Sequence, residues 1–154
     1  METVLHAYCG LYCGACPILL QTLAGEGEQR CQGCKSAVNA EYCATCALKD
    51  CARQKGIAFC GECGELEGCA KMAKFAADTT WLNQRGVLVN LETIKHIGLA
   101  TWLEEQGERW RCAACGRAYS WWHETCPQCG QAVMSCKMEN EAREGGWTSL
   151  SKLW

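Results

Sequence analysis

The sequence has no long hydrophobic run and no excess of one charge, and each shortage excludes a class of protein. Its longest apolar stretches are only a few residues, which excludes a membrane-spanning helix and argues against a membrane partner. Fifteen Lys and Arg against seventeen Asp and Glu leave a formal charge of −2, too little basic charge for a histone-like binder. The first ten residues lack the features of a secretory signal, so we expect a cytoplasmic protein.

Motifs for common catalytic chemistry are also missing. The chain contains no phosphate-binding glycine loop, no recognisable carboxylate pair and no Ser/His/Asp set. Ser120 and His123 lie close together in the sequence, but no buried carboxylate is predicted to accompany them. We therefore favour a protein that is not an enzyme.

Cysteine, in contrast, is abundant, with sixteen in 154 residues. Such a density is typical of secreted disulfide scaffolds, but cytosolic thiols stay reduced and no export signal is present. Six Cys-x2-Cys pairs occur where random placement would give roughly 1.6. Because two thiolates at this spacing can hold one tetrahedral ion from a single turn, the pattern favours metal over disulfides. The pairs are Cys13/Cys16, Cys31/Cys34, Cys43/Cys46, Cys60/Cys63, Cys112/Cys115 and Cys126/Cys129.

Cysteine and tryptophan are concentrated in different parts of the chain. Eleven cysteines lie within residues 9–69, whereas all seven tryptophans lie within residues 81–154. The predicted fold class is a small metal-stabilised α+β protein, with short helices around an irregular cysteine-rich array and a C-terminal β-hairpin zinc ribbon. The predicted parts are a cysteine-rich multi-metal module over residues 1–75, a helical connector over 76–109, a zinc ribbon over 110–131 and a tail over 132–154.

Local sequence signals predict four helices. The first begins at Pro17 and ends by Gly25, and the second covers residues 44–55 before Gly56. The third covers residues 65–77, and the fourth covers residues 91–106 after an Asn90 cap. In the last of these, Leu91, Ile94, Gly98 and Trp102 fall on one face. From Gly145 onward the chain has no clear period, and we expect it to be loosely held.

The strongest local signal is a pair of turns near the C-terminus. Ten residues separate the Cys112/Cys115 pair from the Cys126/Cys129 pair, and a glycine follows each pair. This spacing resembles a zinc ribbon or a rubredoxin-type knuckle pair, in which four thiolates close a tetrahedral site. Zinc is the favoured ion because a site without a spare ligand is structural, and a mononuclear iron electron carrier is the alternative.

Aromatic residues separate the two turns. Tyr119, Trp121 and Trp122 could form a surface for stacking bases or holding a partner, with Arg109, Arg111 and Arg117 nearby. We favour the simpler interpretation that these rings are buried as the apolar face of a small domain.

The eleven N-terminal cysteines are also predicted metal ligands, and eleven does not divide into four-ligand sites. Either three thiols are left over, or His6 or Cys136 supplies a twelfth ligand, or one site has three protein ligands. The first three cysteines have the spacing of radical S-adenosylmethionine enzymes, but the chain is too short for their barrel. The eleven are Cys9, Cys13, Cys16, Cys31, Cys34, Cys43, Cys46, Cys51, Cys60, Cys63 and Cys69.

The same stretch resembles a family of uncharacterised cysteine-rich bacterial and archaeal proteins, classed as a domain of unknown function. The matching motifs are Cys9-Gly-x-x-Cys13-x-x-Cys16, Cys31-x-Gly-Cys34, the segment 42–51, Lys55-Gly56 with the cysteines of 60–69, and Gly98-Leu-x-x-Trp102-Leu. The resemblance extends to Gly130 and implies shared architecture and metal binding, but no known activity.

Two metal chemistries suit this array. The dispersed pairs favour Zn²⁺ in the array as in the ribbon, whereas the scarcity of histidine favours the alternative, [4Fe-4S] clusters in the array. We therefore predict a non-enzymatic zinc-organised binding or regulatory module with a protein partner, or with nucleic acid at the ribbon. The alternatives are an iron–sulfur redox protein and a thiol sensor that uses a leftover cysteine such as Cys136.

Overall fold

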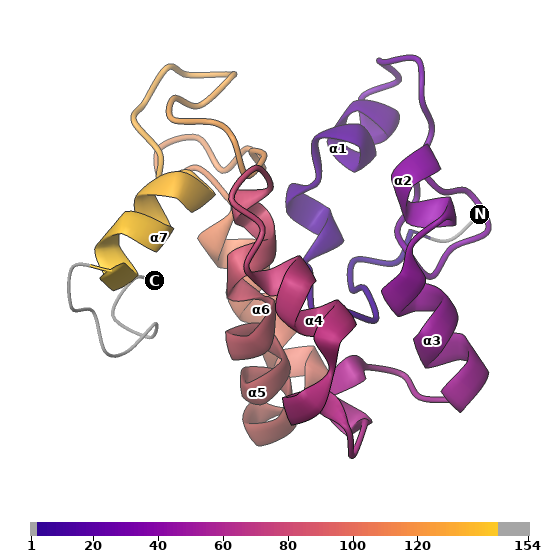
Figure 1. Ribbon diagram of the computed structural model, residues 1–154. Coiled ribbons are helices and arrows are strands. Elements are labelled where there is room, and N and C mark those ends of the chain that lie inside the picture. Colours follow the sequence, from indigo (N-terminus) through magenta and orange to yellow (C-terminus); the bar gives the residue numbers. More distant parts are fainter. Residues whose placement is uncertain (1–2, 145–154) are drawn as a thin grey trace.

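The computed structural model describes residues 3–144, and it consists of short helices joined by loops (Figure 1). No helix in that range is long and apolar enough to cross a membrane. The α-helices are α1 (Pro17–Leu23), α2 (Glu41–Ala44), α3 (Ala47–Lys55), α4 (Ala70–Ala76), α5 (Val87–Ile97), α6 (Leu99–Arg109) and α7 (Cys136–Glu144). Four 3₁₀ turns complete the set: η1 (Cys13–Ala15), η2 (Cys60–Glu62), η3 (Leu66–Gly68) and η4 (Leu82–Gly86).

The predicted α+β class and its C-terminal β-hairpin ribbon are wrong. Residues 3–144 contain isolated antiparallel bridges but no strand, and the fold is helical. Two of these bridges, Arg111 with Ala118 and Thr125 with Ala132, each close one Cys-x2-Cys turn on itself. The turns are therefore present, but the hairpin predicted between them is not.

Three backbone groups between the turns bond to residues outside this segment. The Trp121 N–H donates to the Ala15 carbonyl at 3.1 Å, and the Trp121 carbonyl accepts from the Cys136 N–H at 2.8 Å. The Tyr119 N–H donates to the Trp110 carbonyl at 3.0 Å. Tyr119 and Trp121 also bury their rings. Tertiary packing therefore occupies the backbone groups that a hairpin would need for its own hydrogen bonds.

The four predicted helices match the structure to different degrees. The helix from Pro17 is confirmed as α1, with Pro at its first position as expected. Of the helix predicted over 44–55, α3 covers residues 47–55 and residue 44 ends α2, because Cys46 adopts an extended conformation between them; Gly56 ends α3 with φ +68°. Of residues 65–77, only α4 is α-helical.

The prediction of one helix over residues 91–106 is wrong. Gly98 has φ +85° and ψ +159°, which separates α5 from α6. Asn90 lies inside α5 and caps nothing; its side chain instead donates to the Gly10 carbonyl at 2.9 Å. Since only glycine adopts this backbone conformation easily, the break is encoded at Gly98.

One buried cluster joins the cysteine-rich half to the aromatic half. It includes Leu19 of α1, Met72 of α4, Val87 of α5 and Trp102 of α6, all nearly inaccessible to solvent. The Tyr12 and Trp102 rings meet edge to face, with centroids 6.1 Å apart. In Figure 1, α1, α2 and α3 lie on one side of the molecule and α7 on the other.

The division of the chain into parts at residues 75, 109 and 131 stays a prediction. The loosely held tail from residue 145 onward lies outside the described residues.

A buried ion pair fastens α7 to α6. The Arg109 guanidinium donates to a Glu139 carboxylate oxygen at 2.7 and 3.0 Å, to the Tyr119 hydroxyl at 2.8 Å and to the Met134 carbonyl at 3.1 Å. Arg143 pairs with the second oxygen of Glu139. Arg109 therefore has a structural role, and its guanidinium does not face solvent to meet a phosphate.

We expect Arg109→Ala to lower the free energy of unfolding by about 3 kcal/mol, because it leaves Glu139 poorly compensated in a buried site. Urea unfolding of the metal-loaded protein, followed by tryptophan fluorescence, measures the change. Arg117→Ala, at an exposed position, is the matched control and should shift the value by less than about 0.5 kcal/mol. Equal shifts in the two variants would contradict the role assigned to the buried pair.

Candidate metal centre

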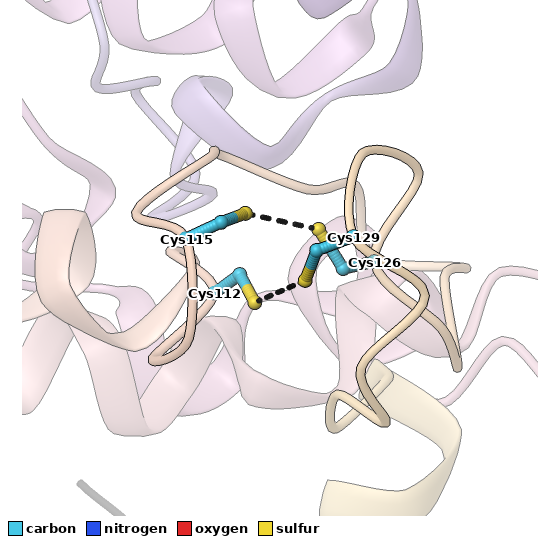
Figure 2. A group of neighbouring side chains, drawn as sticks. All are labelled: Cys112, Cys115, Cys126 and Cys129. Carbon is cyan, nitrogen blue, oxygen red and sulfur yellow. Dashed lines mark hydrogen bonds between the residues drawn. The ribbon is translucent and has the colours of Figure 1, made fainter.

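Four cysteines from the two C-terminal turns converge on one point. The Sγ atoms of Cys112 and Cys129 are 3.6 Å apart, and those of Cys115 and Cys126 are 3.5 Å apart (Figure 2). All four Sγ atoms lie within 4.8 Å of one another. Cys112 and Cys126 are buried, whereas Cys115 and Cys129 face solvent, so the group lies at the protein surface with one side closed.

Each turn is shaped by a glycine that directly follows its second cysteine. Gly116 has φ +78° and Gly130 has φ +75°, a conformation that costs other residues about 1–2 kcal/mol. The Gly116 N–H donates to the Cys112 carbonyl at 2.8 Å, and the Gly130 N–H donates to the Cys126 carbonyl at 3.0 Å. The two turns thus repeat one geometry, which explains why their sulfur atoms meet.

Backbone amides favour the thiolate form of one ligand. The N–H groups of Cys129 and Gln128 point at Cys126 and lower the pKa of its thiol to about 6. Arg117 N–H lowers the pKa of Cys115 in the same way, but partial desolvation and the neighbouring sulfurs raise it to about 12. The group therefore contains one readily ionised sulfur, that of Cys126, and one that holds its proton more tightly, that of Cys115.

This geometry suits a single tetrahedral ion. A Zn–S bond of about 2.3 Å in a tetrahedron places neighbouring sulfurs about 3.8 Å apart. The distances of 3.5 and 3.6 Å are close to that value. The four cysteines could therefore hold a metal ion, as the sequence predicted for these residues.

The eleven N-terminal cysteines are arranged differently. Within residues 3–144, none of them belongs to a set of three or more possible ligands whose atoms lie within 4.8 Å of one another. Four of them line one cavity, and the other seven do not. The seven-cysteine group comprises Cys9, Cys13, Cys16, Cys31, Cys34, Cys43 and Cys46, and the four-cysteine group comprises Cys51, Cys60, Cys63 and Cys69. Their assignment as metal ligands stays a prediction.

The seven-cysteine group is mostly buried. Burial raises the pKa of Cys13 to about 12, and the thiolates of Cys34, Cys16 and Cys31 add to the effect. A hydrogen bond from Cys43 lowers the pKa of Cys31 to about 5. Thiols this close in a dry environment ionise together only if a cation compensates them.

Two side chains near this group have contacts with it that the sequence did not reveal. Lys49 is buried on α3 and donates to the Asn39 side-chain oxygen at 2.5 Å. Burial raises the pKa of Cys34, and the charge of Lys49 opposes that rise. The Tyr42 hydroxyl lies 3.3 Å from the Cys16 sulfur. A lysine and a tyrosine in helical segments have no sequence signature that separates them from ordinary surface residues.

The comparison with known proteins covers the N-terminal part of the chain. Residues 5–74 match the family described as "Protein of unknown function (DUF3795)". The match includes all eleven N-terminal cysteines, supports the predicted resemblance there, and does not extend to the C-terminal turns. No curated protein and no solved structure matches the chain.

Gly33 provides a test of how tightly the Cys31–Cys34 turn is packed. It has φ +112°, and an added Cβ would lie 1.9 Å from the Val4 carbonyl oxygen. We expect Gly33→Ala to lower the free energy of unfolding by about 3 kcal/mol, because strain and a backbone clash combine. Gly25 also has a positive φ, +75°, but an added Cβ there meets open space, so Gly25→Ala should cost only about 1 kcal/mol. Similar urea midpoints for the two variants would disprove the clash.

Proposed function

We propose that the protein is a non-enzymatic, cytoplasmic binding module whose C-terminal part is organised by one Zn²⁺ ion. The observation that supports this proposal is the group of four sulfur atoms within 4.8 Å of one another. Cys112, Cys115, Cys126 and Cys129 would fill all four tetrahedral positions and leave none for a substrate or a reactive water. A closed site of this kind stabilises a fold and performs no catalysis.

The ion would organise the connection between the two turns, which carries an exposed tryptophan. Trp122 is 40% exposed, and its ring centroid lies 6.4 Å from that of Trp81, which is 53% exposed. We call these two side chains the tryptophan pair. Tryptophan is enriched at the centres of protein interfaces, so the tryptophan pair is our candidate contact surface.

A protein partner suits this surface better than a nucleic acid. Of the three arginines near the turns, Arg109 is buried against Glu139, whereas Arg111 and Arg117 are exposed. Two exposed cations supply little of the phosphate neutralisation on which nucleic-acid affinity depends. The tetrathiolate site would add a further charge of −2 beside them.

Zinc binding is tested by elemental analysis of the purified protein and of two variants. We expect Cys129→Ser to lose about one zinc per chain, because three thiolates hold the ion far less tightly. Cys136→Ser is the control, since Cys136 is buried on α7 outside the four-sulfur group. Equal zinc content in the two variants would contradict the proposed site.

Partner binding is tested with a photo-crosslinking amino acid at position 122. In cells, we expect discrete protein adducts that disappear when Cys129→Ser is combined with the crosslinker, because the turn then loses its ion. The same crosslinker at Glu67, an exposed position on η3, is the control and should give no such adduct. Adducts with RNA alone, or none at position 122, would refute a protein-binding role for the tryptophan pair.

A further inference from the structure

We propose that Cys51, Cys60, Cys63 and Cys69 together hold one [4Fe-4S] cluster in the cavity that they line. The cavity has a volume of about 700 Å³ and lies between α3, η2, η3 and α4. The proposal concerns a second metal centre, and it does not depend on the zinc site near the C-terminus.

Three separate elements bring these cysteines to the same cavity. Cys51 lies in the middle of α3, and Cys60 opens η2. Cys63 directly follows η2, and Cys69 is the N-cap of α4, where its sulfur accepts from the Met72 N–H at 3.4 Å. Residues 18 positions apart in the sequence thus line one space, as the ligands of a single polynuclear centre do.

The spacing of the sulfurs favours a cluster over a single ion. Within residues 3–144, the C-terminal tetrathiolate is the one set of possible ligands gathered within 4.8 Å, and the four-cysteine group is more open. A [4Fe-4S] core holds its thiolates farther apart than one ion does, because each thiolate binds a different corner of a cube. The cavity of about 700 Å³ is also far larger than the roughly 30 Å³ taken by one water molecule in the liquid.

The walls of the cavity are largely apolar. Leu48 and Met72 are buried, and Ile57 is half-buried, on the sides between the cysteines. Apolar walls limit the access of water and oxidants to the sulfides of a cluster, and they tune its potential. A zinc site would gain less from such a space, because its four thiolates alone complete its coordination.

A lysine offsets part of the charge that such a cluster carries. A [4Fe-4S]²⁺ core with four thiolates has a net charge of −2. The Lys55 ammonium lies 3.1 Å from the Cys63 sulfur and 2.6 Å from a Glu65 carboxylate oxygen. That ammonium lowers the pKa of Cys63, whereas burial, followed by the neighbouring thiolates of Cys69, Cys51 and Cys63, raises the pKa of Cys60 to about 11.

The cluster is tested by anaerobic reconstitution of the full chain with ferrous iron and sulfide. We expect broad absorption near ~400 nm, and we expect Cys63→Ser and Cys69→Ser each to lose about four irons and four sulfides relative to the unmodified chain. Because the result is a difference, iron held by the seven-cysteine group does not affect it. Cys129→Ser is the control, and it should lose zinc while its iron content stays unchanged. Unchanged iron in both cavity variants, or zinc in place of iron in the unmodified chain, would overturn the proposal.

A milder substitution tests the same site without removing a ligand. Lys55 is exposed, so Lys55→Gln should fold, keep its iron, and lower the reduction potential of the cluster because a positive charge beside Cys63 is lost. Arg53→Gln is the matched control, since Arg53 is also exposed on α3 but does not line the cavity. Equal potentials in the two variants would place the cluster elsewhere and overturn the assignment.

Discussion

Sulfur atoms 3.5 and 3.6 Å apart cannot all be ionised unless a cation lies among them. This constraint governs the C-terminal part of the molecule. Gly116 and Gly130 fold two identical turns toward one point, and backbone amides favour the thiolate of Cys126. The residues between the turns contribute no sulfur to the group and pack into the core instead, where the Trp121 N–H donates to the Ala15 carbonyl.

The same packing connects the C-terminal sulfurs to the cysteine-rich half. Trp121 contributes its ring and its backbone to a cluster that also contains Leu19 and Trp102. Arg109, at the end of α6, pairs with Glu139 of α7. In the sequence, α6 precedes the two turns and α7 follows them. The group of four sulfur atoms is therefore held by a core that extends through both halves of the chain.

Sequence signals located the ligands better than they located the fold. Pro17 and Gly56 act within a few residues of their own position, so the start of α1 and the end of α3 could be predicted. The Cys-x2-Cys turns near the C-terminus are equally local. Local sequence could not show that no hairpin forms between them, because the backbone groups of this segment bond to Ala15, Trp110 and Cys136.

The same limit applies to the N-terminal array. Spacing predicts all eleven cysteines as metal ligands, but which four of them line one cavity depends on how α3, η2 and α4 pack. Lys49 and Lys55 lie beside thiolates for the same tertiary reason. In α5 and α6, the apolar period continues through Gly98, so hydrophobic patterning alone cannot detect the break.

Three helices of this protein begin directly after a cysteine: α1 after Cys16, α3 after Cys46 and α4 after Cys69. Helices of seven to nine residues are too short to persist by themselves, because the first turn fixes several dihedral angles for a single hydrogen bond. An ion bound to such a cysteine would fix the chain at the point where that first turn forms. Metal capture at these cysteines would then be coupled to the nucleation of the helices, and ion release would make them fray from their N-terminal ends.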